Sequence, residues 1–146
     1  MSAKKEILRI VDANFNRSRE GLRVCEDIAR FIMNSSALTK ELKALRHGIS
    51  GIIRSSPGMA KVLLESRDSA GDCGRIPNPE IEVPRREASD IFTANIERAR
   101  ESIRVLEEFF KLADIGLSTK FSRLRFKAYA IEKKAAKRLS SLRHSR

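Results

Sequence analysis

The sequence predicts an all-α protein, a bundle of four main helices built from a helix–turn–helix unit that occurs twice, with a long central loop. Three observations predict this fold: an internal repeat, apolar residues at helical spacing, and the lack of segments with the two-residue alternation of a strand. A chain of 146 residues is the size of one domain. We therefore interpret residues 1–146 as a single helical domain with repeats at about 7–54 and 88–133 and a basic tail at about 134–146.

The repeat is clearest in two segments, 13–26 and 94–107, which share eight identical residues in fourteen positions. A weaker likeness continues into the segments that follow, where Leu45-Arg46 corresponds to Leu124-Arg125. Each copy is long enough for two helices and a turn. A bundle with pseudo-two-fold symmetry is the expected result.

The first helix is predicted from a broad apolar face with a period of 3.6 residues. The segment Asn34-Ser35-Ser36 favours the end of this helix. The residues of the apolar face are Ile10, Val11, Phe15, Leu22, Cys25, Ile28, Ala29 and Ile32.

The second helix is predicted to start at a cap formed by Ser36 or Thr39 and to run through Ile53. Ser55-Ser56-Pro57-Gly58 breaks it, and a short helix is expected at 59–65. These helices complete the first repeat and its connection.

The second repeat follows the longest loop of the chain, 66–84, which is rich in Gly, Pro, Asp, Ser and Asn. Loops of this length in a small domain are usually functional or disordered. Ser89 or Asp90 is expected to cap the next helix, which ends near 114–116, and the last helix is expected from 118 to about 142.

The net charge of +11 is concentrated at the carboxyl end. From Leu117 onward ten basic residues face one acidic residue, which leaves +2 for residues 1–116. A dedicated nucleic-acid binder would spread this charge over the domain and carry more aromatic residues than the 5% found here. Nucleic-acid binding is therefore not favoured, although a non-catalytic bundle that binds nucleic acid or a partner protein through its basic last helix stays open as an alternative.

The sequence also bears on location and redox state. No stretch approaches 18 uncharged apolar residues, and the amino terminus lacks the pattern of a signal peptide, so we expect a cytoplasmic protein without membrane contact. Cys25 and Cys73 are too few for a disulfide framework. We expect both to be reduced thiols, with Cys73 a small apolar filler.

Two asparagines of the repeat, Asn14 and Asn95, fall in the middle of the apolar faces. Burying an unpartnered amide costs about 1–3 kcal/mol, so each must bond the other Asn, a helix carbonyl, water or a ligand. Arg17 and Arg98 follow three residues later, and Glu20 and Glu101 three residues after those. This repeated spacing is either a buried network that ties the two halves together or a ligand pocket.

The start of the central loop carries a second group of candidate residues. Gly71 and Gly74 allow the backbone to come close to a phosphate, and Arg67 can bind a phosphate through two hydrogen bonds. The carboxylates of Asp68 and Asp72 are suitable ligands for Mg²⁺. The segment is neither a Walker A loop nor a dinucleotide fingerprint.

Taken in order, these motifs resemble the small helical hydroxymethylpyrimidine phosphate kinase family of thiamine biosynthesis. This family occurs as a free-standing protein and as the amino-terminal part of fusions with thiamine phosphate synthase. The likeness covers nearly the whole chain up to about Lys133, and it is carried by residues 9–17, 21–27, 45–47, 67–74, 94–95 and 104–108.

The resemblance implies transfer of the γ-phosphoryl group of ATP to 4-amino-5-hydroxymethyl-2-methylpyrimidine phosphate, with Mg²⁺. On this basis the catalytic residues are expected to be Arg67, Asp68 and Asp72, with Mg²⁺ on Asp68 and Asp72 and with Glu20 or Glu101 positioning metal-bound water. Thiamine phosphate synthase is an expected partner, and the repeat makes a homodimer plausible. The residues expected to bind substrate or phosphate are Asn14, Arg17, Asn95, Arg98, Gly71 and Gly74.

Overall fold

The computed structural model describes residues 2–75 and 84–144, and within them the chain forms five α-helices and no strand. The prediction of an all-α bundle is confirmed, including the short helix after the first repeat. Residues 76–83 of the predicted long loop and residues 145–146 of the predicted tail lie outside the described residues. The helices are α1 (Ser2–Phe31), α2 (Ser36–Ser55), α3 (Met59–Ser66), α4 (Ala88–Phe110) and α5 (Ile115–His144).

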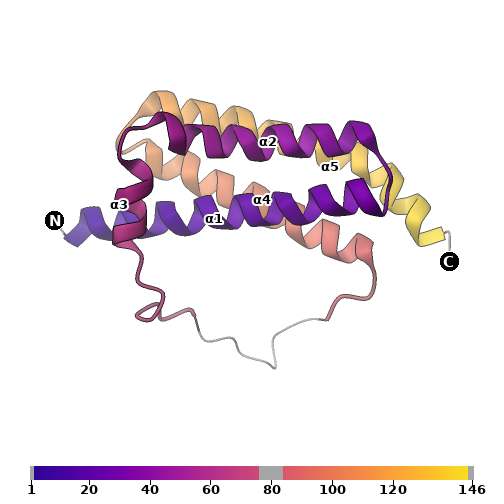
Figure 1. Ribbon diagram of the computed structural model, residues 1–146, viewed down its shortest axis with the longest axis horizontal. Helices are drawn as coiled ribbons and strands as arrows, with labels where there is room; N and C mark the ends of the chain where they lie inside the picture. Colours follow the sequence, from indigo (N-terminus) through magenta and orange to yellow (C-terminus); the bar gives the residue numbers. More distant parts are fainter. Residues whose placement is uncertain (1, 76–83, 145–146) are drawn as a thin grey trace.

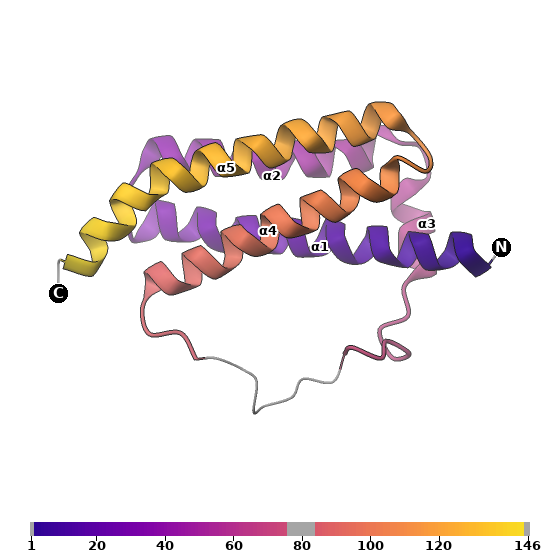
Figure 2. The same ribbon diagram turned by 180° about the vertical axis from the view of Figure 1, so that it is seen from behind.

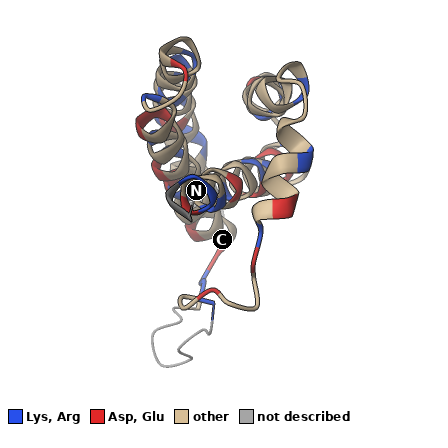
Figure 3. Cartoon of the chain, turned by 90° about the vertical axis from the view of Figure 1, so that its left-hand side faces the viewer, with Lys and Arg blue, Asp and Glu red and all other residues tan. Residues whose placement is uncertain are grey.

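The four long helices form two layers. The first layer holds α1 and α4, which make the most extensive helix–helix contact, and the second layer holds α2 and α5 (Figures 1 and 2). Each half of the repeat contributes one helix to each layer, because α1 packs against α2 and α4 packs against α5. The view along the bundle in Figure 3 shows the segments that follow α3 and precede α4 on the side of the first layer away from α2 and α5.

The core lies between these layers and is centred on three phenylalanine rings. Phe15 of α1 contacts Phe110 of α4 and Phe121 of α5 edge-on, at centroid distances of 6.2 and 5.7 Å. Phe110 and Phe121 lie 5.2 Å apart. These edge-to-face contacts join three helices at one point, and each ring pair adds about 0.5–1.5 kcal/mol to the free energy of burial.

Helices α1 and α4 approach each other closely at Gly21. A methyl group added there would lie 2.8 Å from the backbone oxygen of Asn95 and 3.7 Å from Cβ of Ala99. The first of these neighbours is a backbone atom, so a methyl group would fit only if the two helices moved apart. Gly21 therefore sets the distance between the two repeats.

We expect Gly21→Ala to destabilise the protein by about 1–3 kcal/mol, the usual cost of overpacking a core contact. Gly51→Ala in α2 is the matched control, because a methyl group added at Gly51 meets nothing within 4 Å. There the higher helix propensity of alanine should stabilise the protein by about 0.5–1 kcal/mol. Urea unfolding of both variants measures the two effects, and equal shifts would show that the close approach at Gly21 does not constrain the bundle.

Two buried ion pairs occupy equivalent places in the two repeats. Arg46 Nε donates to Glu26 Oε1 at 2.9 Å, and Arg125 Nε donates to Glu107 Oε2 at 3.0 Å. Both glutamates are buried, with 5% and 6% of their surface exposed. Each glutamate also pairs with an arginine three residues earlier in its own helix, Arg23 or Arg104, but an arginine from the next helix covers it.

The helix boundaries differ from the predicted ones at their caps. Ser35, not Ser36 or Thr39, caps α2, because its hydroxyl accepts the N–H of Leu38 at 3.2 Å. Helix α4 begins one residue before Ser89, which is buried within the first turn.

The start of α5 also differs, since it lies at Ile115, three residues earlier than expected. Its first turn is satisfied by Asp114 Oδ1, which accepts the N–H groups of Gly116 and Leu117 at 2.9 and 3.2 Å.

The basic end of the chain continues α5 through residue 144 and contacts α2 and the end of α1. Lys134 Nζ pairs with Glu41 Oε1 at 2.6 Å, and Arg138 donates to the backbone oxygen of Met33. Ala135 is fully buried. Some of the basic residues at this end of the chain thus form contacts within the bundle. No described helix combines the length and apolar character that crossing a membrane requires.

Both cysteines are free thiols, as expected. Cys25 is buried, its Sγ donates to the backbone oxygen of Phe92 at 3.5 Å, and burial raises its pKa to about 12. Cys73 is exposed, so its expected role as a small apolar filler is wrong.

Candidate functional site

Most of the predicted site residues line two pockets on the first helix layer, whereas Gly71 and Gly74 line neither of them. The first pocket has a volume of about 420 Å³ and lies between α1 and the segment that follows α3. The second has a volume of about 520 Å³ and lies along α4, with two residues from α1. Both pockets border α1, where Ala13 and Asn16 line the first while Asn14 and Arg17 line the second.

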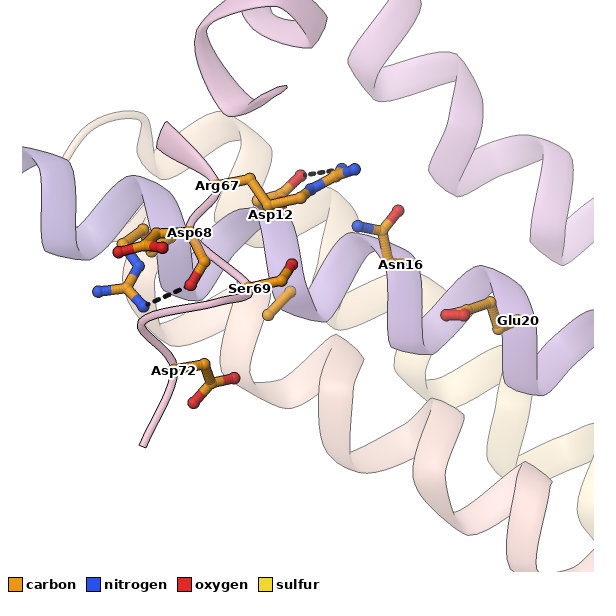
Figure 4. Close-up of a pocket in the computed structure, with 9 residues that line it drawn as sticks. Asp12, Asn16, Glu20, Arg67, Asp68, Ser69 and Asp72 are labelled. Carbon is orange, nitrogen blue, oxygen red and sulfur yellow. Dashed lines mark hydrogen bonds and ion pairs between the residues drawn. The ribbon is translucent and has the colours of Figure 1, made fainter. Parts of the chain in front are cut away.

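An ion pair between Arg67 and Asp12 forms the base of the first pocket (Figure 4). Arg67 directly follows α3, and its Nε and Nη2 both donate to the Asp12 carboxylate at 2.8 Å. The Asp12 side chain is only 9% exposed, whereas that of Arg67 is 42% exposed. The hydrogen bonds and charge of Asp12 raise the pKa of Arg67. Asp12 therefore fixes one side of a cation whose other side faces the pocket.

The rest of the first pocket is built from a helix face and a tight loop. Asp12, Asn16 and Glu20 follow one another at four-residue spacing along α1, so they share one face of the helix. Arg9, one turn earlier, donates through Nη2 to the backbone oxygen of Asp68 at 3.3 Å. This bond holds the loop against α1.

Each of the two loop carboxylates accepts a hydrogen bond from the backbone of the loop itself. Asp68 Oδ1 accepts the N–H of Gly71, and Asp72 Oδ1 accepts the N–H of Gly74, each at 2.9 Å. A methyl group on Gly71 would lie 2.4 Å from Asp68 Oδ2. Gly71 thus permits the turn, and in this conformation the two glycine N–H groups bind carboxylates of the loop.

The second pocket contains the repeated amides. Asn14 Nδ2 donates to the backbone oxygen of Ile10, and Asn95 Nδ2 donates to that of Ile91, both at 2.8 Å. Of the partners considered for these amides, a helix carbonyl is the one found. Each amide retains a second N–H and an oxygen acceptor.

Two arginines of the second pocket have exposed side chains. Arg17 and Arg98 form no ion pair or side-chain hydrogen bond with any residue in the described ranges 2–75 and 84–144. Arg85, from the segment before α4, lines the same pocket. The arrangement gathers positive charge around a cavity.

The structure thus divides the predicted site into two groups. Glu20, Arg67, Asp68 and Asp72 line the first pocket, whereas Asn14, Arg17, Asn95, Arg98 and Glu101 line the second. Arg67 therefore lines a different pocket from Arg17 and Arg98.

The candidate metal ligands are divided as well, with Glu101 in a different pocket from Glu20. No group of three or more His, Cys, Asp or Glu residues among the described residues is arranged to hold a metal ion. Asp68 and Asp72 do line the same pocket. This is sufficient for Mg²⁺ in phosphoryl-transfer sites, where one or two carboxylates and the substrate phosphates usually bind the ion.

The pocket residues that sequence reasoning missed include Arg9, Asp12, Asn16 and Arg85. For Asp12 and Asn16 a signal was present, because they share the four-residue spacing that ends at Glu20. No sequence pattern distinguished Arg9 or Arg85 from the other arginines.

Comparisons with known proteins agree on one family. A family model described as the ThiD2 family matches residues 9–134. Proteins named thiamine-phosphate synthase from Rhodopirellula baltica and from a Synechocystis strain are 37% and 36% identical over 126 residues, or 86% of this chain. These matches cover 33% and 35% of the relatives, so the chain spans about a third of their length. No solved structure matches the chain.

Proposed function

Because the chain belongs to the ThiD2 family, we propose that it acts in thiamine biosynthesis as an ATP- and Mg²⁺-dependent kinase of 4-amino-5-hydroxymethyl-2-methylpyrimidine phosphate. The bond between the γ-phosphorus of ATP and its bridging oxygen breaks, and a phosphate oxygen of the acceptor forms the new bond. The products are ADP and the pyrimidine diphosphate. The names of the relatives, thiamine-phosphate synthase, support the link to this pathway.

One observation carries the proposal: adjacent residues of α1 line two pockets, and arginines line both of them. The reaction joins two phosphate-bearing substrates, so it requires two neighbouring sites that tolerate negative charge. Phosphoryl transfer depends mainly on positioning and on cations around the phosphates, and an acceptor that is already a phosphate needs no strong base. The reaction therefore needs cations and positioning more than a nucleophilic side chain.

In the first pocket Arg67 stabilises the charge on the transferred group, and Asp12 keeps its guanidinium in place. Asp68 and Asp72 are the residues that would hold Mg²⁺, which neutralises phosphate charge when bound. Glu20, on the neighbouring face of α1, is placed to accept hydrogen bonds from water in the same pocket.

The test is release of ADP from the purified chain with ATP, Mg²⁺ and the pyrimidine monophosphate, coupled to thiamine phosphate formation by added synthase. We expect turnover that requires both substrates. A folded protein without turnover would contradict the kinase function. If such a protein instead bound RNA or DNA with an affinity that falls steeply with salt, the basic helix α5 would become the functional surface.

A further inference from the structure

The two pockets differ in charge, and the difference assigns each to one substrate. We infer that the second pocket binds the pyrimidine monophosphate directly, without a metal ion, and that the first pocket receives the nucleotide together with Mg²⁺. This inference rests on the proposed kinase function and specifies which cavity holds which substrate.

The first argument is the balance of charged residues. The first pocket is lined by two arginines and four carboxylates, whereas the second is lined by three arginines and two carboxylates. A phosphate that enters the first pocket meets a net negative wall unless a divalent cation accompanies it. The second pocket is net positive and suits a phosphate by itself.

The second argument is the state of the arginines. Arg67 is bound by Asp12, and Arg9 is bound to the backbone of Asp68. In the second pocket Arg17 and Arg98 have no ion-pair partner among the residues described. Their guanidinium groups can bind a phosphate through paired hydrogen bonds, and no ion pair with a carboxylate has to break first.

The third argument is the chemistry of the two asparagines. A 4-aminopyrimidine ring presents an amino donor beside a ring-nitrogen acceptor, and a side-chain amide has the complementary oxygen and N–H. Asn14 and Asn95 bring such amides to the second pocket from α1 and α4. Each is held by a hydrogen bond to its own helix, so the amide is oriented before substrate binds.

The repeat explains how one fold provides two related pockets. Ala13, Asn16 and Glu20 of the first pocket correspond in the alignment of the repeats to Ala94, Glu97 and Glu101 of the second. The helix faces are therefore equivalent, and the other lining residues make the difference: Arg17 and Arg98 of the repeats line only the second pocket. Arg67, Asp68 and Asp72 complete the first pocket, whereas Arg85 completes the second.

The experiment is isothermal titration calorimetry on the full chain with two probes: the pyrimidine monophosphate in EDTA, and a non-hydrolysable ATP analogue with Mg²⁺. Arg98→Gln is expected to weaken binding of the monophosphate by about tenfold or more, since a charged hydrogen-bond donor is lost, and to change nucleotide binding less than about threefold. Arg9→Gln should weaken nucleotide binding and spare the monophosphate. Arg54→Gln, an exposed residue of α2 away from both pockets, should change neither.

The assignment is overturned if Arg98→Gln weakens nucleotide binding and spares the monophosphate, or if the monophosphate binds the wild-type chain only when Mg²⁺ is present. In those cases ADP release by the wild-type chain would still support the kinase function. A folded wild-type chain that binds neither probe and releases no ADP overturns the assignment and the kinase function together.

Discussion

Arg67→Ala is expected to lower kcat/KM of the kinase reaction by about 10²–10³-fold, the usual effect of removing one preorganised donor from a charged transition state. Asp12→Asn should also lower it, because the amide no longer holds the guanidinium by charge. The double variant should be no slower than Arg67→Ala alone, because Asp12 acts through Arg67. Steady-state kinetics of the three variants gives this comparison directly.

Stability measurements separate this positioning role from a general loss of fold. Arg67→Ala leaves the buried carboxylate of Asp12 without its partner, so it should lower the free energy of unfolding, and adding Asp12→Asn should restore part of that loss. Activity should not return with stability. If the double variant regained turnover along with stability, the ion pair between Arg67 and Asp12 would have only a structural role.

Two further variants test the loop by itself. Asp72→Asn preserves the size of the side chain and removes the charge that would bind Mg²⁺, so a large loss of activity is expected. Arg75→Ala, an exposed residue three positions later that does not line the pocket, should change activity less than about threefold. Near-native turnover in both Asp72→Asn and Arg67→Ala would exclude a catalytic role for the loop.

The fold could be predicted because its determinants are local and repeated. The eight identities between segments 13–26 and 94–107 indicate a duplicated helix before any contact is known. The position of Asn14 and Asn95 on apolar faces correctly indicates amides that need a partner. Their actual partners, carbonyls one turn earlier on the same helix, were among the alternatives that the sequence allowed.

The burial of Glu26 and Glu107 could not be predicted from the helices taken singly. Both lie at the margin of an apolar face, and a helical wheel cannot indicate which neighbour covers that margin. Arg46 and Arg125 do so from the second layer. An ion pair between helices depends on how they cross, which hydrophobic periodicity does not determine.

The division of the site into two pockets was unpredictable for a related reason. Consecutive helical residues point about 100° apart, so Asn16 and Arg17 face different sides of α1. Which side forms which cavity depends on where α4 crosses and where the loop returns. The ion pair of Asp12 with Arg67 joins residues 55 positions apart in the chain, and nothing local in the sequence relates them.

Arg125→Met is expected to lower the free energy of unfolding at pH 7 by about 3 kcal/mol, the lower end of the range for breaking a buried ion pair. Arg125 is the principal partner of Glu107, and both side chains are largely buried, at 15% and 8% exposed. The value lies at the lower end because Arg104 also pairs with Glu107 at 3.1 Å. Arg104→Met is the matched control: its side chain is 53% exposed, so its loss should cost less than about 1 kcal/mol.

The pH dependence of this loss has a definite sign. Burial raises the pKa of Glu107, but hydrogen bonds from Arg125 and Ser122 and the charge of Arg125 outweigh it and hold the pKa below the ordinary value of 4.5. A carboxyl with a lowered pKa in the folded state stabilises the protein above 4.5, and this contribution is lost as the pH falls through the folded-state pKa. Arg125→Met removes the largest influence that lowers the pKa of Glu107, so the pKa should rise and the variant should lose less stability than wild type on acidification.

The difference in unfolding free energy between wild type and Arg125→Met should therefore shrink as the pH falls from 7 to below 4.5. Urea unfolding at several pH values measures it, with Arg104→Met followed in parallel. A difference that stays constant over this range would mean that the lost stability comes from packing of the Arg125 side chain and not from the charge of Glu107. Arg46→Met should also lower the free energy of unfolding at pH 7, because it removes the interhelical partner of the buried Glu26 carboxylate in the first repeat.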